Sequence, residues 1–552
     1  MEKKPMRRRD ISKALFATAA GSALVAQRAE AQTCTAPCFA QTAAEIAAGV
    51  TPVNYASPPG YVSRYGANTV PGTTNMSTAI MNAVNSNQGE RIYIDTGLTL
   101  AAGIILSGSS YSGTEIYCIN GSELLFAPNG ENFNFKSYLW ALVLIQGCDR
   151  VVLDLRINAN RQNMTETEWI YPVSFMGSTN CYCPSLIIRE TRGDGLYIDW
   201  YDPTQSTGQT NSQNIVVDSL YVYNTTNDGR NACSVISCNG LTIGQLTSYQ
   251  VGAVVGGLQL GGLDIEPDFP AQSVTDVVIG NLNVTTNGAT GLAIQGLSTS
   301  GNDNNQDWNV QRVTIMNARV RQTGSGSFLM TRVWDATVQV DQINLTYHIG
   351  AQVDYCNRIN LTISLANTTQ GLIVGTNGYV FDSNITLYLN YYSQNGLGGL
   401  EVTGVERTTF KGKMCNAVSG ANAIAVQFND NSRSLTQTGV VYSLDFPYDA
   451  NLYCVFYNGT GTGAVTIGPG TCIKDCTMFG FPYTVQTNFQ IPSYNCGGRN
   501  HGTGGAAAPT NGTWAAFDET VLDQTEGATA PRAKCIAGGS PGTWKLYSVM
   551  ST

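Results

Sequence analysis

Short runs in which apolar and polar residues alternate recur along most of the chain. Alternation with a period of two residues predicts strands that bury one face. Each run begins with a small residue, and turns rich in Asn, Asp and Gly separate the runs. The runs cover residues 141–145, 172–175, 195–199, 232–236, 262–266, 291–295, 326–329, 350–354, 371–374, 399–402 and 422–426.

The spacing of these runs predicts a solenoid. Successive copies lie about 20 to 37 residues apart, with one or two further alternating runs between them, such as 214–217, 241–243 and 277–279. A β-propeller would need a more regular period of ~40 residues and four strands per blade. A β-sandwich would not repeat so often, and the two-residue period excludes helical repeats.

The segment before the repeats predicts a capping element. Residues 61–67 predict a short strand entering a turn. A helix is expected over 75–84, with Asn75 or Ser77 as its N-cap and with Ile80 and Val84 on one face. Strands are then expected over 91–95 and 98–106.

The entry segment and the repeat together resemble a known family. The residues 63–67, Ser-Arg-Tyr-Gly-Ala, and 78–80, Thr-Ala-Ile, resemble the pattern that caps the right-handed parallel β-helix of the pectin lyase-like superfamily, which includes pectate lyases, polygalacturonases and phage tailspike glycosidases. The resemblance covers residues 61–430 and implies an all-β, right-handed parallel β-helix of about ten or more coils with a short N-terminal capping helix. The Asp-rich loop of the pattern is replaced by residues 68–75, which contain no Asp, and the Gly-His-Gly and Arg-x-Lys elements of polygalacturonases do not occur in the coils.

The two ends of the chain predict export and a further small module. Arg8-Arg9-Asp10-Ile11-Ser12-Lys13 and the apolar run 14–26 resemble a bacterial twin-arginine signal, and the run is shorter than the ~20 residues of a membrane span. We therefore expect a signal peptide over 1–31 and a periplasmic or extracellular location. A linker is expected over 32–60, the β-helix over 61–435, its C-terminal end over 436–496, and a Gly/Ala-rich linker with a small β module over 497–552.

The composition of the chain argues against several classes of binding partner. The net charge is −9 with a pI of about 4.9, which argues against nucleic acid and anionic membranes, since both are bound chiefly through Lys and Arg. Local disulfides are conceivable for Cys34/Cys38, Cys233/Cys238 and Cys472/Cys476. A thiolate metal site is not expected, because the chain has no Cys-x-x-Cys pair and only two His.

Candidate chemistry gathers on the run 262–266. With Leu263 and Ile265 in the core, Asp264 and Glu266 share the outer face, roughly 6.5 to 7 Å apart. That separation is near the ~6.5–9.5 Å between the two carboxyl groups of inverting glycosidases.

Alignment of the coils extends this pair into an acidic patch. It places Tyr197, Ser234, Asp264 and Ala293 in one outer column and Asp199, Ile236, Glu266 and Gln295 in the next. Asp199 would lie about 9.6 Å from Glu266. The patch is completed by residues in the turns that precede the strands, namely Asp194, Asp228 and Arg230.

Long polar insertions flank the patch. The segments 202–214 and 299–309 are much longer than a tight turn and are expected to wall a groove. Four aromatic residues at or near them, Tyr197, Trp200, Tyr201 and Trp308, are expected to contact sugar rings.

The sequence therefore predicts an exported glycoside hydrolase that acts on a polysaccharide. We expect Glu266 to be the general acid and Asp264 or Asp199 to be the base that activates water, since crowded carboxylates separate their pKa values. Arg230 would hold an acidic sugar. No cofactor is expected for this reaction.

Two alternatives stay open. One is a lyase with Arg230 as base and calcium held by Asp199, Asp264, Glu266 and Asp268. The other is a non-catalytic protein that binds carbohydrate at a surface. The chain could act as a single rod or, like tailspikes, as a homotrimer.

Overall fold

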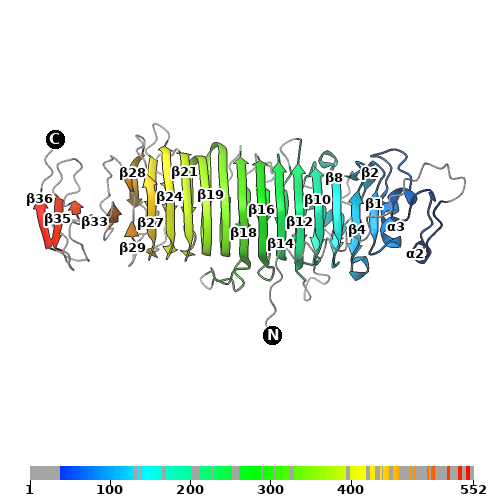
Figure 1. Ribbon diagram of the computed structural model, residues 1–552, viewed down its shortest axis with the longest axis horizontal. Coiled ribbons are helices and arrows are strands. Elements are labelled where there is room, and N and C mark those ends of the chain that lie inside the picture. The colour runs from blue at the N-terminus through cyan, green and yellow to red at the C-terminus, as the bar shows by residue number, and fades with distance from the viewer. Residues whose placement is uncertain are drawn as a thin grey trace, which may run out of the picture.

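The chain winds into a long rod of stacked parallel strands (Figure 1). The computed structural model describes residues 38–446 except for the gaps 129–133, 137–138, 165–168, 202–209, 226–228, 252–259, 287–289, 304–305, 323–327, 393–397, 418–422, 429–435 and 438, and beyond residue 446 only the strands β28 to β36. The fold is an all-β parallel β-helix, as the period of the sequence predicts.

Two stacks of parallel strands form the walls of the rod. The first stack consists of β3 (Ile104–Ser107), β7 (Leu139–Gln146), β9 (Ile170–Met176), β11 (Leu196–Asp199), β13 (Cys233–Val235), β15 (Leu260–Ile265), β17 (Thr290–Gln295), β19 (Phe328–Val374), β22 (Gly398–Val402), β25 (Ala423–Phe428) and β28 (Leu452–Asn458). The long β19 passes through several coils and belongs to both stacks. Every pairing within the stack is parallel, so equivalent residues of successive coils lie in columns.

The second stack contains longer strands. It consists of β1 (Arg91–Ile94), β4 (Glu115–Cys118), β8 (Val152–Asn158), β10 (Tyr182–Arg189), β12 (Ser212–Tyr223), β14 (Cys238–Tyr249), β16 (Val274–Thr286), β18 (Val310–Gln322), β19, β21 (Asn384–Tyr392), β24 (Thr409–Ala417) and β27 (Val441–Phe446). β2 (Leu98–Ala101) pairs with β5 (Glu123–Phe126), and β20 (Val380–Phe381) with β23 (Val405–Glu406). The coil pattern continues through β30 (Cys472–Ile473) and β31 (Thr477–Met478), which both pair with β27.

Short strands complete the described chain. β6 (Asn134–Lys136) is antiparallel to β7, and β26 (Thr436–Gln437) pairs with β29 (Thr466–Ile467). The small C-terminal module is a separate five-stranded sheet of β32 (Tyr494–Cys496), β33 (Arg499–Thr503), β34 (Glu519–Val521), β35 (Arg532–Ala537) and β36 (Thr543–Tyr547), with β33 lying in the segment expected to be a linker. Among the described residues, no helix has both the length and the apolar character needed to cross a bilayer.

The interior is a set of apolar columns. The column Val173, Leu196, Cys233, Leu263, Leu292 and Phe328 runs in register through six strands, and every member is buried. Cys233 and Cys238, expected as a local disulfide, are both free thiols in this core. They lie on strands of different stacks, so their side chains serve packing. Cys38 is disulfide-bonded, whereas Cys34 and Cys476 lie outside the described residues.

The small residue that begins each run has a steric cause. A Cβ added at Gly262 would lie 2.1 Å from the carbonyl oxygen of Gly291, the equivalent residue of the next coil. At Gly371 the corresponding distance to the Gly399 carbonyl oxygen is 1.9 Å. Because atoms cannot approach so closely, the stacking of coils at this position requires a residue without a side chain or with a very small one.

A column of residues with positive φ lies within β16, β18 and β19 and directly after β20 and β23. Asp and Arg alternate along it from coil to coil, in the order Asp276, Arg312, Asp335, Arg358, Asp382 and Arg407. Three of the contacts are ion pairs at 2.7 Å or closer, formed by Arg312 with Asp276, Arg358 with Asp335 and Arg407 with Asp382. We call this column the charge ladder.

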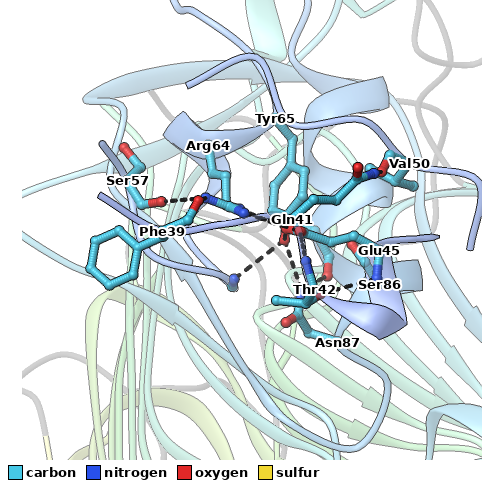
Figure 2. A network of polar contacts seen from close by, with 12 residues as sticks. Phe39, Gln41, Thr42, Glu45, Val50, Ser57, Arg64, Tyr65, Ser86 and Asn87 are labelled. Atoms are coloured by element: carbon cyan, nitrogen blue, oxygen red, sulfur yellow. Dashed lines mark hydrogen bonds and ion pairs between the residues drawn. The ribbon is translucent and has the colours of Figure 1, made fainter. Parts of the chain in front are cut away.

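The N-terminal end of the rod is closed by two short helices and a buried ion pair (Figure 2). The helix α2 (Ala43–Ala47) begins with a capping box between Thr42 and Glu45. Glu45 accepts hydrogen bonds from Arg64 Nε and Nη2 and from the Tyr65 hydroxyl. Residues 38–60, expected to be a linker, therefore contribute a buried part of the cap.

The second capping helix lies where it is predicted, but its N-cap is Met76, which makes no side-chain capping bond, and not Asn75 or Ser77. The helix α3 (Ser77–Ser86) buries Ile80 and Val84, while the Asn75 side chain accepts hydrogen bonds from the backbone and hydroxyl of Ser77. The strand expected over 61–67 is instead the short 3-10 helix η1 (Val62–Arg64), which presents Arg64 to Glu45. The strand expected over 98–106 is divided into β2 and β3.

Candidate active site

The acidic residues predicted from the sequence lie side by side on the outer face of the first stack. Strand register pairs Tyr197 with Ser234, Ser234 with Asp264, and Asp264 with Ala293, which is the predicted column. Asp199 ends β11, and Glu266 follows β15 directly. The structure thus brings Asp194, Asp264, Glu266 and Arg230 together. Asp199 and Asp194 both act on the buried Tyr171 and Tyr197, whereas Asp228 lies outside the described residues.

Asp264 and Glu266 form an interacting acid pair. Asp264 is only 2% exposed, and its Oδ2 accepts a hydrogen bond from Asn231 Nδ2 at 3.3 Å. Its Oδ1 is buried and accepts no hydrogen bond from the residues described. Burial, together with the charges of Glu266 and Asp194, raises the pKa of Asp264 well above its usual range. These features favour a protonated Asp264 that interacts with the Glu266 carboxyl group.

Glu266 is the more accessible member of the pair. It is half-buried, and burial followed by the nearby charge of Asp268 raises the pKa of its carboxyl group. Arg230 and the interaction with Asp264 act in the opposite direction. A glutamic acid with a raised pKa at the edge of a buried polar cluster can donate a proton to a bound molecule.

Arg230 supplies the positive charge of the site. Its Nη1 lies 3.8 Å from Asp194 Oδ2, and its side chain is 25% exposed. Asp194 is fully buried, and its Oδ1 accepts a hydrogen bond from the backbone of Asn231 at 3.0 Å. The Arg230 charge lowers the pKa of both members of the acid pair, so the guanidinium lies within electrostatic range of each.

Asp199 is buried and has several hydrogen-bond donors around it. Its Oδ1 accepts from the Trp200 backbone at 2.7 Å and from Gln272 Nε2 at 2.9 Å. Its Oδ2 accepts from the Tyr197 hydroxyl at 3.3 Å. Because this buried carboxylate is engaged by three donors, these contacts favour a positioning role over the predicted role as base.

The predicted sugar-binding aromatics are mostly covered. Tyr197 stacks on Tyr171 with ring centroids 4.1 Å apart, within an apolar cluster on the outer face. Trp308 is 1% exposed and meets Trp334 edge to face. Tyr201 is half-buried, so the sites expected to be open to solvent are largely filled by side chains of the cluster. The rings of Tyr197, Trp200 and Trp308 therefore present no open face in this arrangement.

Several polar residues of the site have no recognisable signal in the sequence. Buried polar atoms on the same outer face that find no hydrogen-bond partner in the described part of the chain are Gln146 Nε2, Tyr171 Oη, Ser174 Oγ, Asn231 Oδ1 and Asp264 Oδ1. Each such atom costs about 1–3 kcal/mol unless water or a ligand satisfies it. Their grouping favours a hydrated or ligand-binding face. This face cannot be recognised from the sequence, because its members are single polar residues within apolar runs that only the fold brings together.

The calcium site of the lyase alternative stays a prediction. Within the described ranges, no three His, Cys, Asp or Glu side chains are arranged to hold a metal ion. The insertion 299–309 is folded back on itself, with Asp307 accepting hydrogen bonds from Ser298 and Thr299. The insertion 202–214 falls largely within the gap 202–209.

The chain matches no known protein-family model and no curated protein sequence. Among solved structures it is similar to the A-module of the mannuronan C-5 epimerase AlgE6 from Azotobacter vinelandii, with a TM-score of 0.33 and 11% sequence identity. That similarity covers 79% of this chain and 98% of the module. Membership of the pectin lyase-like superfamily stays a prediction.

Proposed function

We propose that the protein is a glycoside hydrolase that cleaves a polysaccharide on the outer face of its β-helix. The observation that supports this most is the acid pair, in which the buried Asp264 near the end of β15 and the half-buried Glu266 directly after it interact. Two carboxyl groups whose environments separate their pKa values suit proton transfer to and from a glycosidic bond.

The proposed reaction uses Glu266 as the general acid. Protonated Glu266 donates to the glycosidic oxygen as the bond from the anomeric carbon to that oxygen breaks, and water adds to that carbon. The proton lost by the water goes to a carboxylate. Asp268 is suited to this role, because it is exposed and its charge raises the pKa of Glu266. Asp264, whose pKa is raised well above its usual range, keeps its proton and supports Glu266 through their mutual contact.

An incubation with polygalacturonate, alginate, dextran and xylan tests this proposal. Hydrolysis releases new reducing ends without an ultraviolet-absorbing product. Glu266→Gln is expected to lower kcat by a factor of about 10² to 10⁴. Glu90→Gln, which changes an exposed Glu on the N-terminal side of β1, is the matched control and leaves the rate unchanged. Unshortened polymers that nevertheless bind would indicate the non-catalytic alternative.

A lyase is the second candidate, supported by the place of Arg230 beside the acid pair. In a lyase, a base removes the proton next to the carboxylate of a uronic acid, and the bond to the leaving sugar oxygen breaks to give a carbon–carbon double bond. The product absorbs ultraviolet light. The same incubation, read by absorbance, distinguishes this reaction from hydrolysis.

A further inference from the structure

Phe269 exposes an aromatic ring close to the acid pair. It follows Glu266 in the loop between β15 and β16, and 56% of its side chain is exposed. Its ring stacks on Trp200 with centroids 6.1 Å apart and an interplanar angle of 16°. Trp200 is only 7% exposed, so it forms a solid backing for one side of the Phe269 ring.

The loop that carries Phe269 is fixed by a buried glutamine. Gln272 Oε1 accepts hydrogen bonds from the backbone N–H groups of Asp268 at 2.7 Å and Phe269 at 2.8 Å. The Gln272 backbone N–H donates to the Phe269 carbonyl oxygen at 3.0 Å. Because Gln272 is itself buried, these contacts hold the loop without competition from bulk water.

Neighbouring coils hold this glutamine in turn. Gln272 Nε2 donates to Asp199 Oδ1 at 2.9 Å. From the other side, Asn309 Nδ2 donates to the carbonyl oxygens of Gln272 at 2.9 Å and Phe269 at 3.3 Å. Asp199 therefore reaches the exposed ring through a chain of hydrogen bonds, and the loop is pre-organised from two coils.

The exposed Phe269 ring offers a fixed apolar face to a partner. Full burial of such a side chain stabilises a protein by roughly 1.5–3 kcal/mol. Phe269 does not gain this full stabilisation, because more than half of its side chain is exposed. A partner that combines an apolar face with polar edges suits this loop, because Phe269 directly follows Asp268, whose charge acts on Glu266. A pyranose ring has both: its C–H face packs on an aromatic ring, and its hydroxyls donate to carboxylates.

We propose that Phe269, backed by Trp200, is a binding subsite for a sugar ring of the polysaccharide beside the cleaved bond. Asp199 and Gln272 act as positioning residues for this subsite. The role of this subsite in cleavage rests on the proposed function. Its binding of a sugar ring can be measured without cleavage.

The experiment compares Phe269→Ala with Phe269→Trp in the full chain. Loss of the ring is expected to raise KM about three- to tenfold with little change in kcat, and Trp is expected to restore KM. The same substitution is then made in the inactive Glu266→Gln variant. There, Phe269→Ala should raise the dissociation constant for the intact polysaccharide substrate by the same factor, as measured by affinity electrophoresis. Tyr388→Ala, which removes another exposed aromatic side chain on β21, is the control and leaves both quantities unchanged.

A second variant tests the positioning residues. Gln272→Leu removes the side-chain contacts to the loop and to Asp199, and it is expected to raise KM and lower kcat while Phe269 is intact. Equal KM and equal affinity for Phe269→Ala and the unmodified protein would overturn the subsite even if Glu266→Gln abolishes cleavage. Polymer that binds through Phe269 but is never cut would instead overturn the hydrolase. A change in sedimentation coefficient without a change in sugar affinity would also overturn the subsite, because the ring would then serve a protein contact.

Discussion

Arg64 Nε lies 2.6 Å from Glu45 Oε1, and both side chains are fully buried at the N-terminal end of the β-helix. Arg64 also donates to the backbone carbonyl oxygens of Phe39, Ala40 and Ser57. One guanidinium thus joins the segment before the solenoid to the entry into its first coil. A buried pair with all its donors in use is costly to break, because one charge is left without its partner.

Removal of either partner is expected to destabilise the cap strongly. Glu45→Gln and Arg64→Leu should each lower the free energy of unfolding by about 3–5 kcal/mol. The double variant should cost less than the sum, because it leaves no unpaired charge. Denaturant unfolding of the four proteins measures this coupling. Additive effects would show that the two side chains do not act as a pair.

The same pair predicts a loss of stability in acid. Burial alone would raise the pKa of Glu45, but hydrogen bonds from Arg64, the Thr42 amide and Tyr65, together with the Arg64 charge, hold it at about 2. Since the folded pKa is below the ordinary value of 4.5, the stabilisation is complete above pH 4.5 and is lost as pH falls towards 2. Thermal unfolding between pH 5 and about 2 should show this slope, and Glu45→Gln should flatten it.

The buried Asp264 is expected to lower the stability of the protein as pH rises. The pKa of Asp264 is raised by burial and by neighbouring carboxylates, so its contribution is present below the unfolded pKa and is lost as pH rises through the folded pKa. Asp264→Asn imitates the protonated carboxyl group. It should therefore raise the melting temperature at pH 7 to 8. A variant that is less stable than the unmodified protein at pH 8 would contradict a protonated Asp264.

Arg230 provides a test that separates the two candidate reactions. Its charge lowers the pKa of Glu266, so Arg230→Gln should raise that pKa. A hydrolase that needs protonated Glu266 should then keep activity, with the alkaline limb of its pH–rate profile moved to higher pH. A lyase with Arg230 as base should lose activity at every pH. Profiles of kcat against pH for both proteins decide between these outcomes.

The contact between equivalent glycines predicts a sharp steric limit. Gly371→Ala would place a Cβ 1.9 Å from the Gly399 carbonyl oxygen, so the two coils must separate locally. We expect a loss of at least about 2–3 kcal/mol in the free energy of unfolding. Gly121→Ala is the control, since its positive φ costs about 1–2 kcal/mol but no atom lies within 4 Å. Equal losses would show that the coils adjust without cost.

The sequence predicts the solenoid well because its information is periodic. The two-residue alternation identifies the strands of the first stack, and the leading glycines reflect a contact repeated from coil to coil. The same register places Asp264 between Ser234 and Ala293, as the alignment of runs predicts. Long-range columns can be inferred in this way because each coil advances by one strand spacing.

Burial and hydrogen-bond partners could not be inferred from the same pattern. Nothing in the run 195–199 shows that the oxygens of Asp199 are engaged by Tyr197, Trp200 and Gln272. The sequence around Trp308 and Phe269 gives no sign of how exposed either side chain is, yet Trp308 is buried and Phe269 is exposed. These properties depend on how loops from different coils meet, which has no local period. The catalytic roles assigned to the patch therefore stay predictions.

The charge ladder restricts how such a rod can change its length. Asp and Arg alternate along it from one winding to the next between Asp276 and Arg407. Deleting or duplicating a single winding there would set two like charges against each other, whereas a change by two windings would restore the alternation. The unit of growth for this part of the molecule is therefore a pair of windings. Evolutionary insertions and engineered lengthening of this part should therefore add windings in even numbers.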